Sequence, residues 1–250
     1  IASSISPLPE AHAGIVDRFT SVFNQTYTRF LDLQKAEAQA REAQIEAALE
    51  RVRSRAMAMH NSQELKEVAL ELRKQMGLLG QKDLEVCAIH LYGYGEDSFE
   101  SWSAMKAPGS EAKIVQSQAH FPKRGIRIID EMMHHYTIGT KDYVLVNEGE
   151  KMAEWFKVLK KHAPELHASI LDSLGKKPLK QLKGNWAVAD FSGGALVMVT
   201  YGEPDEVSRN LLRRSANVFE QAYVRFLDLQ KAEAQAREAQ IEAAMERYRS

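Results

Sequence analysis

The sequence contains a single cysteine, Cys87, among its 250 residues. One thiol cannot close an intramolecular disulfide and cannot form a cysteine-based zinc site by itself, so a reducing, cytoplasmic environment is expected. The chain also lacks any run of roughly 18 to 20 consecutive apolar residues, which is the length that a membrane-spanning helix needs. These absences predict a cytoplasmic protein with neither disulfides nor a membrane segment.

A net charge is nearly absent as well, because 33 Lys and Arg residues stand against 34 Asp and Glu residues. Bulk charge therefore gives no reason to expect nucleic-acid binding. A basic stretch runs from Lys157 to Lys183, but its sparse aromatic residues and helical spacing favour a solvated surface over a nucleic-acid groove. Residues 1–10 contain no initiator Met and no leader pattern, so we expect an internal portion of a longer chain.

Glycine and proline, which interrupt regular structure, are missing from two long stretches of the chain. Neither occurs between Gly14 and Gly77, and neither occurs after Pro204. This distribution predicts a long helix, a compact mixed domain and a second long helix. The expected divisions are residues 1–60 for the N-terminal linker helix, 61–203 for the domain and 204–250 for the C-terminal linker helix.

The two helical ends are near-copies of each other. Residues 22–54 and 218–250 differ at five of 33 positions, which are 24, 26, 28, 49 and 52 in the first copy. An internal repeat of this quality indicates a tandem array. We therefore expect the first helix to be the end of a preceding module.

The repeated helix carries apolar residues at intervals of seven and four, the pattern of a coiled-coil seam. The seam positions are Leu31, Ala38, Ile45, Leu49, Val52, Ala56 and Met59. Another apolar face at helical spacing holds Phe19, Phe23, Tyr27 and Phe30. Left bare, such faces would form a large apolar patch, so we predict a parallel two-stranded coiled coil and a homodimer. A solvated single helix, stabilised by pairs such as Glu37 with Arg41, is the alternative.

The middle of the chain alternates short apolar runs with turn residues. Strands are expected at residues 84–92, 98–105, 114–121, 142–146, 186–191 and 195–201. Helices are expected at residues 62–76, 126–136 and, in two pieces, 152–174. Six strands joined by local turns, with helices inserted among them, predict the α+β class with an antiparallel sheet.

This order of elements resembles the GAF-type sensor domain of bacterial signalling proteins. Residues 30–65, FLDLQKAEAQAREAQIEAALERVRSRAMAMHNSQEL, are similar to the segments that precede GAF-like domains in large multidomain sensors, including histidine kinases. The resemblance implies a GAF-like, six-stranded antiparallel sheet flanked by helices, with long N- and C-terminal coiled-coil helices. Neither the signature of cyclic-nucleotide-binding members nor the bilin-attaching cysteine of phytochrome-type members has a match, so no cofactor is implied.

The same resemblance implies a function in signal transduction, as part of a two-component system. A domain of this kind binds a small ligand or a partner and relays that event through dimeric helices to an output domain. The alternative is a structural spacer or dimerisation module that has no ligand.

In a GAF-type fold the ligand cavity lies between one face of the sheet and the helices inserted in its middle. Aromatic and polar residues on the bordering elements are the candidates for lining it, although each could equally belong to the core. They are Trp102, His120, Phe121, Tyr136, Tyr143, Trp186 and Asp190. An enclosed cavity beneath the helix at residues 126–136 would support the ligand hypothesis.

No catalytic or metal-binding constellation is indicated. His134 and His135 are adjacent, so on a helix they point about 100° apart and cannot ligate one ion in the usual i, i+4 manner. Asp130 and Glu131 have no acid–base partner implied by spacing. Cys87 lies in the middle of a strand, where a small buried residue is expected. An enzyme is therefore the least favoured class of function.

Overall fold

The computed structural model describes residues 10–80, 84–106, 114–174 and 181–249. Contacts divide the chain into two compact units, Ile1–Glu46 and Ala47–Ser250. This division is made by contacts, whereas the predicted boundaries at residues 60 and 203 follow changes in composition. The three-part division therefore stays a prediction.

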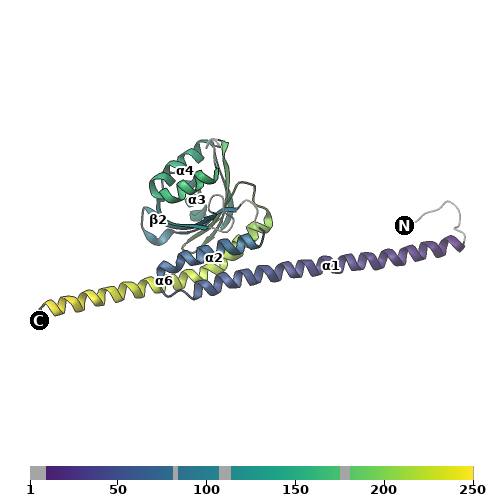
Figure 1. The fold of residues 1–250 in the computed structure, drawn as a ribbon, viewed down its shortest axis with the longest axis horizontal. Coiled ribbons are helices and arrows are strands. Elements are labelled where there is room, and N and C mark those ends of the chain that lie inside the picture. The colour runs from purple at the N-terminus through teal and green to yellow at the C-terminus, as the bar shows by residue number, and fades with distance from the viewer. Residues whose placement is uncertain (1–9, 81–83, 107–113, 175–180, 250) are drawn as a thin grey trace. The chain divides into compact units, whose positions relative to one another are not determined.

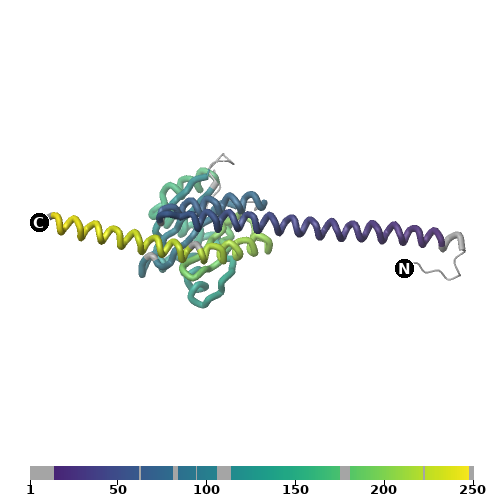
Figure 2. Tube along the Cα trace, turned by 90° about the horizontal axis from the view of Figure 1, so that it is seen from below, coloured from purple at the N-terminus to yellow at the C-terminus, as the bar shows by residue number. Residues whose placement is uncertain are grey.

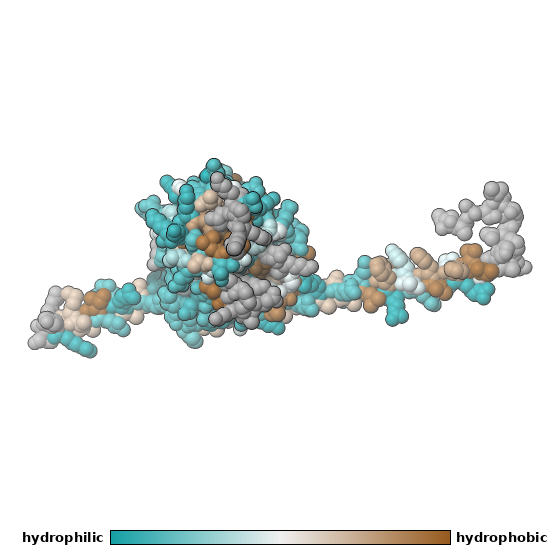
Figure 3. Space-filling model, turned by 45° about the horizontal axis from the view of Figure 1, so that its top comes forward, coloured by the Kyte–Doolittle hydropathy of each residue, from teal (hydrophilic) through white to brown (hydrophobic). Residues whose placement is uncertain are grey.

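The first unit is the N-terminal part of helix α1 (Glu10–Met57). Residues 31–53 consist almost entirely of strong helix formers, which accounts for an uninterrupted helix. Nearly all the described side chains of this unit are exposed to solvent. Hydrophobic and hydrophilic side chains both lie on its surface (Figure 3).

The second unit is built on one antiparallel sheet with the strand order β3-β2-β1-β6-β5-β4. This arrangement confirms the predicted α+β class and the predicted six-stranded sheet, and it is compatible with a GAF-like fold. The strands are β1 (Leu84–Leu91), β2 (Ser98–Lys106), β3 (Ile114–Pro122), β4 (Asp142–Glu148), β5 (Lys183–Phe191) and β6 (Gly194–Thr200).

Helices cover both faces of the sheet (Figure 1). One face packs against α3 (Arg127–Ile138), α4 (Gly149–His162) and α5 (Pro164–Leu174). The other face packs against α2 (Leu65–Leu78) and the first half of α6 (Glu206–Arg249), which run side by side (Figure 2). Two single turns, η1 (Ser62–Glu64) and η2 (Tyr92–Tyr94), complete the described elements.

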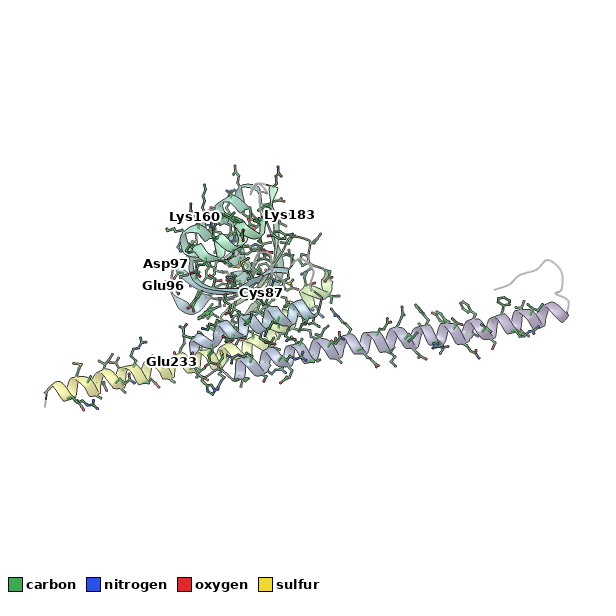
Figure 4. All side chains as sticks on the ribbon, in the orientation of Figure 1. Cys87, Glu96, Asp97, Lys160, Lys183 and Glu233 are labelled. Carbon is green, nitrogen blue, oxygen red and sulfur yellow. The ribbon has the colours of Figure 1, made fainter. Side chains whose placement is uncertain are left out.

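The double cover explains the continuous apolar runs in the sequence. Successive side chains of a strand point to opposite faces, so a strand covered on both sides has no polar face. In β1, Val86 and Ala88 belong to the core beneath α3, α4 and α5. Cys87 and Ile89 alternate with them and are also buried. The expectation of a buried Cys87, labelled within the sheet in Figure 4, is confirmed.

The turn between β5 and β6 anchors α6 to the sheet. The ring of Phe191 lies 5.0 Å from that of Phe219 and 5.3 Å from that of Tyr223, measured between centroids. The backbone N–H of Ser192 donates to Glu220 Oε2 at 2.7 Å. Gly193 lies directly against the Tyr223 ring, where a Cβ atom would stand 1.9 Å from Tyr223 Cε1. Glycine is therefore required here by close approach.

Replacing Gly193 by alanine should consequently loosen α6. Gly193→Ala should lower the free energy of unfolding by about 1–3 kcal/mol, the usual cost of overpacking, and the melting temperature by about 2–4 °C for each kcal/mol. Thermal denaturation followed by circular dichroism measures the effect. Gly95→Ala is the matched control, because its new Cβ would make only an ordinary 3.4 Å contact with Ser98 Oγ. Equal melting temperatures for the two variants would contradict the proposed contact.

Candidate ligand-binding site

A cavity of about 80 Å³ lies between the sheet and helices α4 and α5, and is called the sheet cavity below. The hypothesis placed such a cavity beneath residues 126–136, but none of the lining residues comes from α3. The helical wall is formed by Met152, Trp155, Phe156, Leu159, Leu166, Ile170 and Leu174. The strands and their flanks contribute Glu85, Val86, Ala88, His90, Ser101, Ser103, Phe121, Leu182, Gly184, Trp186, Val197, Val199 and Tyr201.

Three polar side chains, those of His90, Ser101 and Ser103, stand together in the floor of the sheet cavity. His90 pairs with Ser101 across β1 and β2, and Ala88 pairs in the same way with Ser103. The three side chains therefore share one face of two neighbouring strands, and all are buried. Ser103 Oγ donates to the carbonyl oxygen of Ser117 at 3.4 Å.

His90 has an unsatisfied ring atom. Its Nδ1 is buried and has no hydrogen-bond partner among the described residues. A buried polar atom without a partner costs on the order of 1–3 kcal/mol, which a ligand atom bonded to it would offset. Burial lowers the pKa of His90 to about 3, so the ring is neutral near pH 7. A neutral imidazole offers one donor and one acceptor to a ligand.

A second polar group lies at the other end of β1. Ser173 Oγ donates to Glu85 Oε1 at 2.9 Å, and both Glu85 and Tyr201 line the sheet cavity. Burial, and then the charge of Glu85, raise the pKa of Tyr201, so its hydroxyl stays protonated. The cavity thus has an apolar wall with hydrogen-bonding groups toward both ends of one strand.

Two of the predicted pocket residues line the sheet cavity. They are Phe121 on β3 and Trp186 on β5. Both pack against Trp155 of α4, with ring centroids 5.1 Å and 4.9 Å away. An aromatic cluster of this kind is rigid and presents an apolar surface to a bound molecule.

Three other predicted residues meet at a separate place, at the end of α3. The Tyr143 hydroxyl donates to the carbonyl oxygen of Met132 at 3.2 Å and lies 3.4 Å from Asp190 Oδ1. Tyr136 Oη donates to the carbonyl oxygen of Ser192 at 2.7 Å, and Tyr136 and Asp190 line one surface depression. Burial raises the pKa of Asp190 to about 6, opposed by the hydrogen bond from Tyr143. This tyrosine–aspartate cluster lines no part of the sheet cavity.

The last two predicted residues, Trp102 and His120, lie away from both places. Trp102 is buried and borders a surface depression with Lys66 of α2, on the other face of the sheet. His120 is exposed, with its Nε2 3.8 Å from Glu100 Oε1. Of the seven predicted residues, two therefore line the sheet cavity, three meet at α3, and Trp102 and His120 lie elsewhere.

His90, Ser101 and Ser103 were missed by the sequence reasoning. A signal for them existed, since polar residues at alternate positions of otherwise apolar strands stand out against a core. Trp155, Met152 and Phe156 were missed because the face that α4 presents to the sheet depends on how the helix is inserted.

The predicted coiled-coil positions differ in their surroundings. Leu31 and Ala38 are exposed, whereas Ile45 and the later positions are buried. Leu49 and Val52 border a small void together with Leu72 of α2 and Leu211 of α6. Ala56 and Met59 are completely buried. The part of the seam from Leu49 onward is thus occupied within its own chain, and pairing with a second copy stays a prediction.

The described residues contain no group of three or more His, Cys, Asp or Glu side chains that could hold a metal ion. Asp130 Oδ1 accepts the backbone N–H of Gly125 at 3.0 Å, and His135 Nδ1 lies 3.1 Å from Thr140 Oγ1. Both contacts are local to the ends of α3. Burial raises the pKa of Cys87 to about 12, which keeps its thiol protonated and unreactive.

The basic stretch is solvent-exposed where the structure describes it. Lys157, Lys160, Lys161 and Lys183 are exposed, and Lys160 and Lys183 are labelled in Figure 4. Lys176, Lys177 and Lys180 lie outside the described residues.

In the described part of the chain, no helix combines the length and apolar character needed to cross a membrane.

No family model matches the sequence, and no curated protein or solved structure shows significant similarity to it.

The neutral state of His90 makes stability depend on pH. Between about pH 6.5 and pH 3 the unfolded chain binds a proton at His90 that the folded chain does not bind, so stability falls as the pH falls. From pH 6.5 to pH 5 this loss amounts to about 2 kcal/mol. His90→Gln should remove it, as measured by urea unfolding at both pH values. His134→Gln, at an exposed histidine, is the control. An unchanged pH dependence in His90→Gln would contradict a buried, neutral His90.

Proposed function

We propose that the chain is a non-enzymatic, cytoplasmic sensory module of the GAF-like kind, which binds a small ligand in the sheet cavity. Ligand binding would alter the packing of the helical layer on the opposite face of the sheet. The helices would then relay this change to an output domain of a larger signalling protein. The observation that carries the proposal is a cavity between the sheet and helices α4 and α5 that is lined by His90, whose buried Nδ1 has no hydrogen-bond partner among the described residues.

The surroundings of the sheet cavity define the class of ligand. Its walls are aliphatic and aromatic, and the neutral His90 offers hydrogen bonds without a charge. An engineered apolar cavity of roughly 150 Å³ holds benzene. At about 80 Å³ the sheet cavity would hold a small uncharged molecule after minor movement of flexible side chains such as Met152. A cyclic nucleotide or haem would need a far larger opening.

The sheet provides a direct mechanical route to α6. In β6, Val197 and Val199 line the cavity, while Leu196 and Met198 alternate with them and are buried. The carboxylate of Asp142 on β4 lies 3.3 Å from Arg209 and 3.6 Å from Arg213, both on α6. A ligand that displaces these strands would therefore displace contacts of the exit helix.

The dimeric part of the proposal depends on α1. Leu31 and Ala38 are exposed at a seven-residue interval on a helix that has no described cover at these positions. Pairing of two such helices would bury this seam and place two modules side by side. Homodimerisation through the linker helices is therefore part of the proposed relay.

A spacer without a ligand is the second candidate. The small volume of the sheet cavity favours it, since typical ligand pockets measure about 300–1,000 Å³. In that case the apolar wall of the cavity is part of the core, and the long helices determine the length and the oligomeric state of the module.

A thermal-shift screen separates the two candidates. Phenol and indole represent small neutral aromatic compounds, and cyclic nucleotides, haem and charged amino acids serve as contrasting probes. A fitting compound at about 100 times its dissociation constant should stabilise the fold by about 2.7 kcal/mol and raise the melting temperature by about 5 °C or more.

Ala88→Leu is the blocking variant, because Ala88 lies in the floor of the sheet cavity and a larger side chain would fill it. It should fold with at most a modest loss of stability and should lose the shift. Ala168→Leu, at an exposed position of α5, should retain it. Absence of a shift with every probe would favour the spacer, and an equal shift in Ala88→Leu would place binding elsewhere.

Disulfide cross-linking tests the dimer and its response. Ala38→Cys should cross-link between two copies, and the yield should change when a stabilising compound is added. Gln39→Cys, which points about 100° away on the same helix, should cross-link less. Cross-linking yields that are identical at both positions, with or without the compound, would contradict a relay through this seam.

A further inference from the structure

The two copies of the repeated helix have opposite environments. In α6 the aromatic residues of the repeat are buried, with Phe219 only 1% and Tyr223 only 8% exposed. The identical residues of α1 are bare, with Phe23 66% and Tyr27 51% exposed. Phe226 and Phe30 repeat the contrast. The same side chains therefore pack against the rest of the domain in one copy, whereas in the other Phe23 and Tyr27 contact each other, with ring centroids 6.0 Å apart.

In α6 the buried aromatic residues of the repeat pack against the sheet. Phe219 and Tyr223 pack on Phe191 at the end of β5, and Tyr223 lies against the glycine of the following turn. The Arg225 guanidinium also donates to the carbonyl oxygen of Met59 at 3.0 Å. Phe23, Tyr27 and Arg29 occupy the matching positions of the first copy. The first copy thus presents the same set of groups that holds α6 on its sheet.

The second half of the repeat shows the reverse contrast. Ala48 and Leu49 are buried beside Leu72 of α2. Their counterparts Ala244 and Met245 are exposed. Each copy therefore buries a different half of the repeat. In α6 the first half contacts the sheet that precedes this helix in the chain. In α1 the second half contacts the domain that follows this helix.

We propose that the aromatic face of α1, formed by Phe23, Tyr27 and Phe30, is a docking surface for the sheet of a second domain of this type, joined on the N-terminal side. The exposed half of α6 around Met245 is the matching surface for the α2 helix of a domain on the C-terminal side. One continuous helix then belongs to the cores of two successive domains. This arrangement holds whether or not the sheet cavity binds a ligand.

Two of the five differences between the copies lie on the aromatic half of the repeat and are compatible with this role. Thr28 replaces Val224, which is exposed in α6. Asn24 replaces Glu220, and its amide oxygen is likewise an acceptor for a turn N–H such as that of Ser192. The aromatic anchors are unchanged. A helix-to-helix dimer would bury the seam of Leu31 and Ala38, which is a different set of residues from this aromatic face.

The repeat itself allows a direct test. A joined chain made of residues 1–217 followed by residues 22–250 contains two complete sheet domains, with the first-copy helix in the position of α6. Labelling of a Phe23→Cys thiol should be at least about 100-fold slower in the central helix of the joined chain than in α1 of the 250-residue chain. The natural Cys87 is buried and stays unlabelled. Gln25→Cys is the matched control, because its counterpart Gln221 is exposed in α6.

Equal labelling of Phe23→Cys in the two chains would overturn the proposal. Concentration-dependent protection of Phe23→Cys in the 250-residue chain would also overturn it, since the occupant would then be a second copy of the chain. If the cysteine variant fails to fold in the joined chain, hydrogen exchange of the unsubstituted joined chain decides. Residues 22–31 of its central helix should exchange at least about 10-fold more slowly than the same residues of α1, and equal exchange would overturn the proposal.

Discussion

Burial of both faces of the central strands is the constraint on which the rest of the second unit depends. Strands β1, β5 and β6 carry apolar side chains in both directions, so each face needs a cover. Helices α3, α4 and α5 provide one cover, and α2 with α6 provides the other. Along the same backbone, the residues facing the sheet cavity alternate with those facing the helical layer.

The two covers differ in how completely they fill the space. On the α6 side a glycine turn admits the Tyr223 ring, and Phe191 packs against two aromatic residues. On the α4 and α5 side a cavity remains, and His90, one of the residues that line it, has a buried Nδ1 without a hydrogen-bond partner among the described residues. A buried polar atom left unpaired is a destabilising feature, and a ligand that bonds to it would remove the cost. This difference makes the α4 and α5 side of the sheet the better candidate for a ligand-binding site.

Much of the fold could be predicted from local patterns. Short apolar runs bounded by turn residues located all six strands, and helix-forming residues located the long helices. The pocket could be predicted only in part. Which residues line it depends on the face of the sheet to which each side chain points and on the register between the strands. Phe121 and Trp186 line the sheet cavity, but Trp102, an equally plausible aromatic residue on a neighbouring strand, faces the other way. The void lies under α4 and α5 instead of α3, since packing between helix and sheet decides where space remains.

The sequence by itself determined that residues 22–54 and 218–250 form helices with the same aromatic face, because helix propensity and side-chain spacing are local properties. It could not determine which half of each helix is buried. Phe23 and Phe219 occupy equivalent positions in near-identical sequences, yet one is exposed and the other is in a core. Only the tertiary structure decided this, because burial depends on which sheet lies within reach of the helix, and that contact joins residues far apart in the chain.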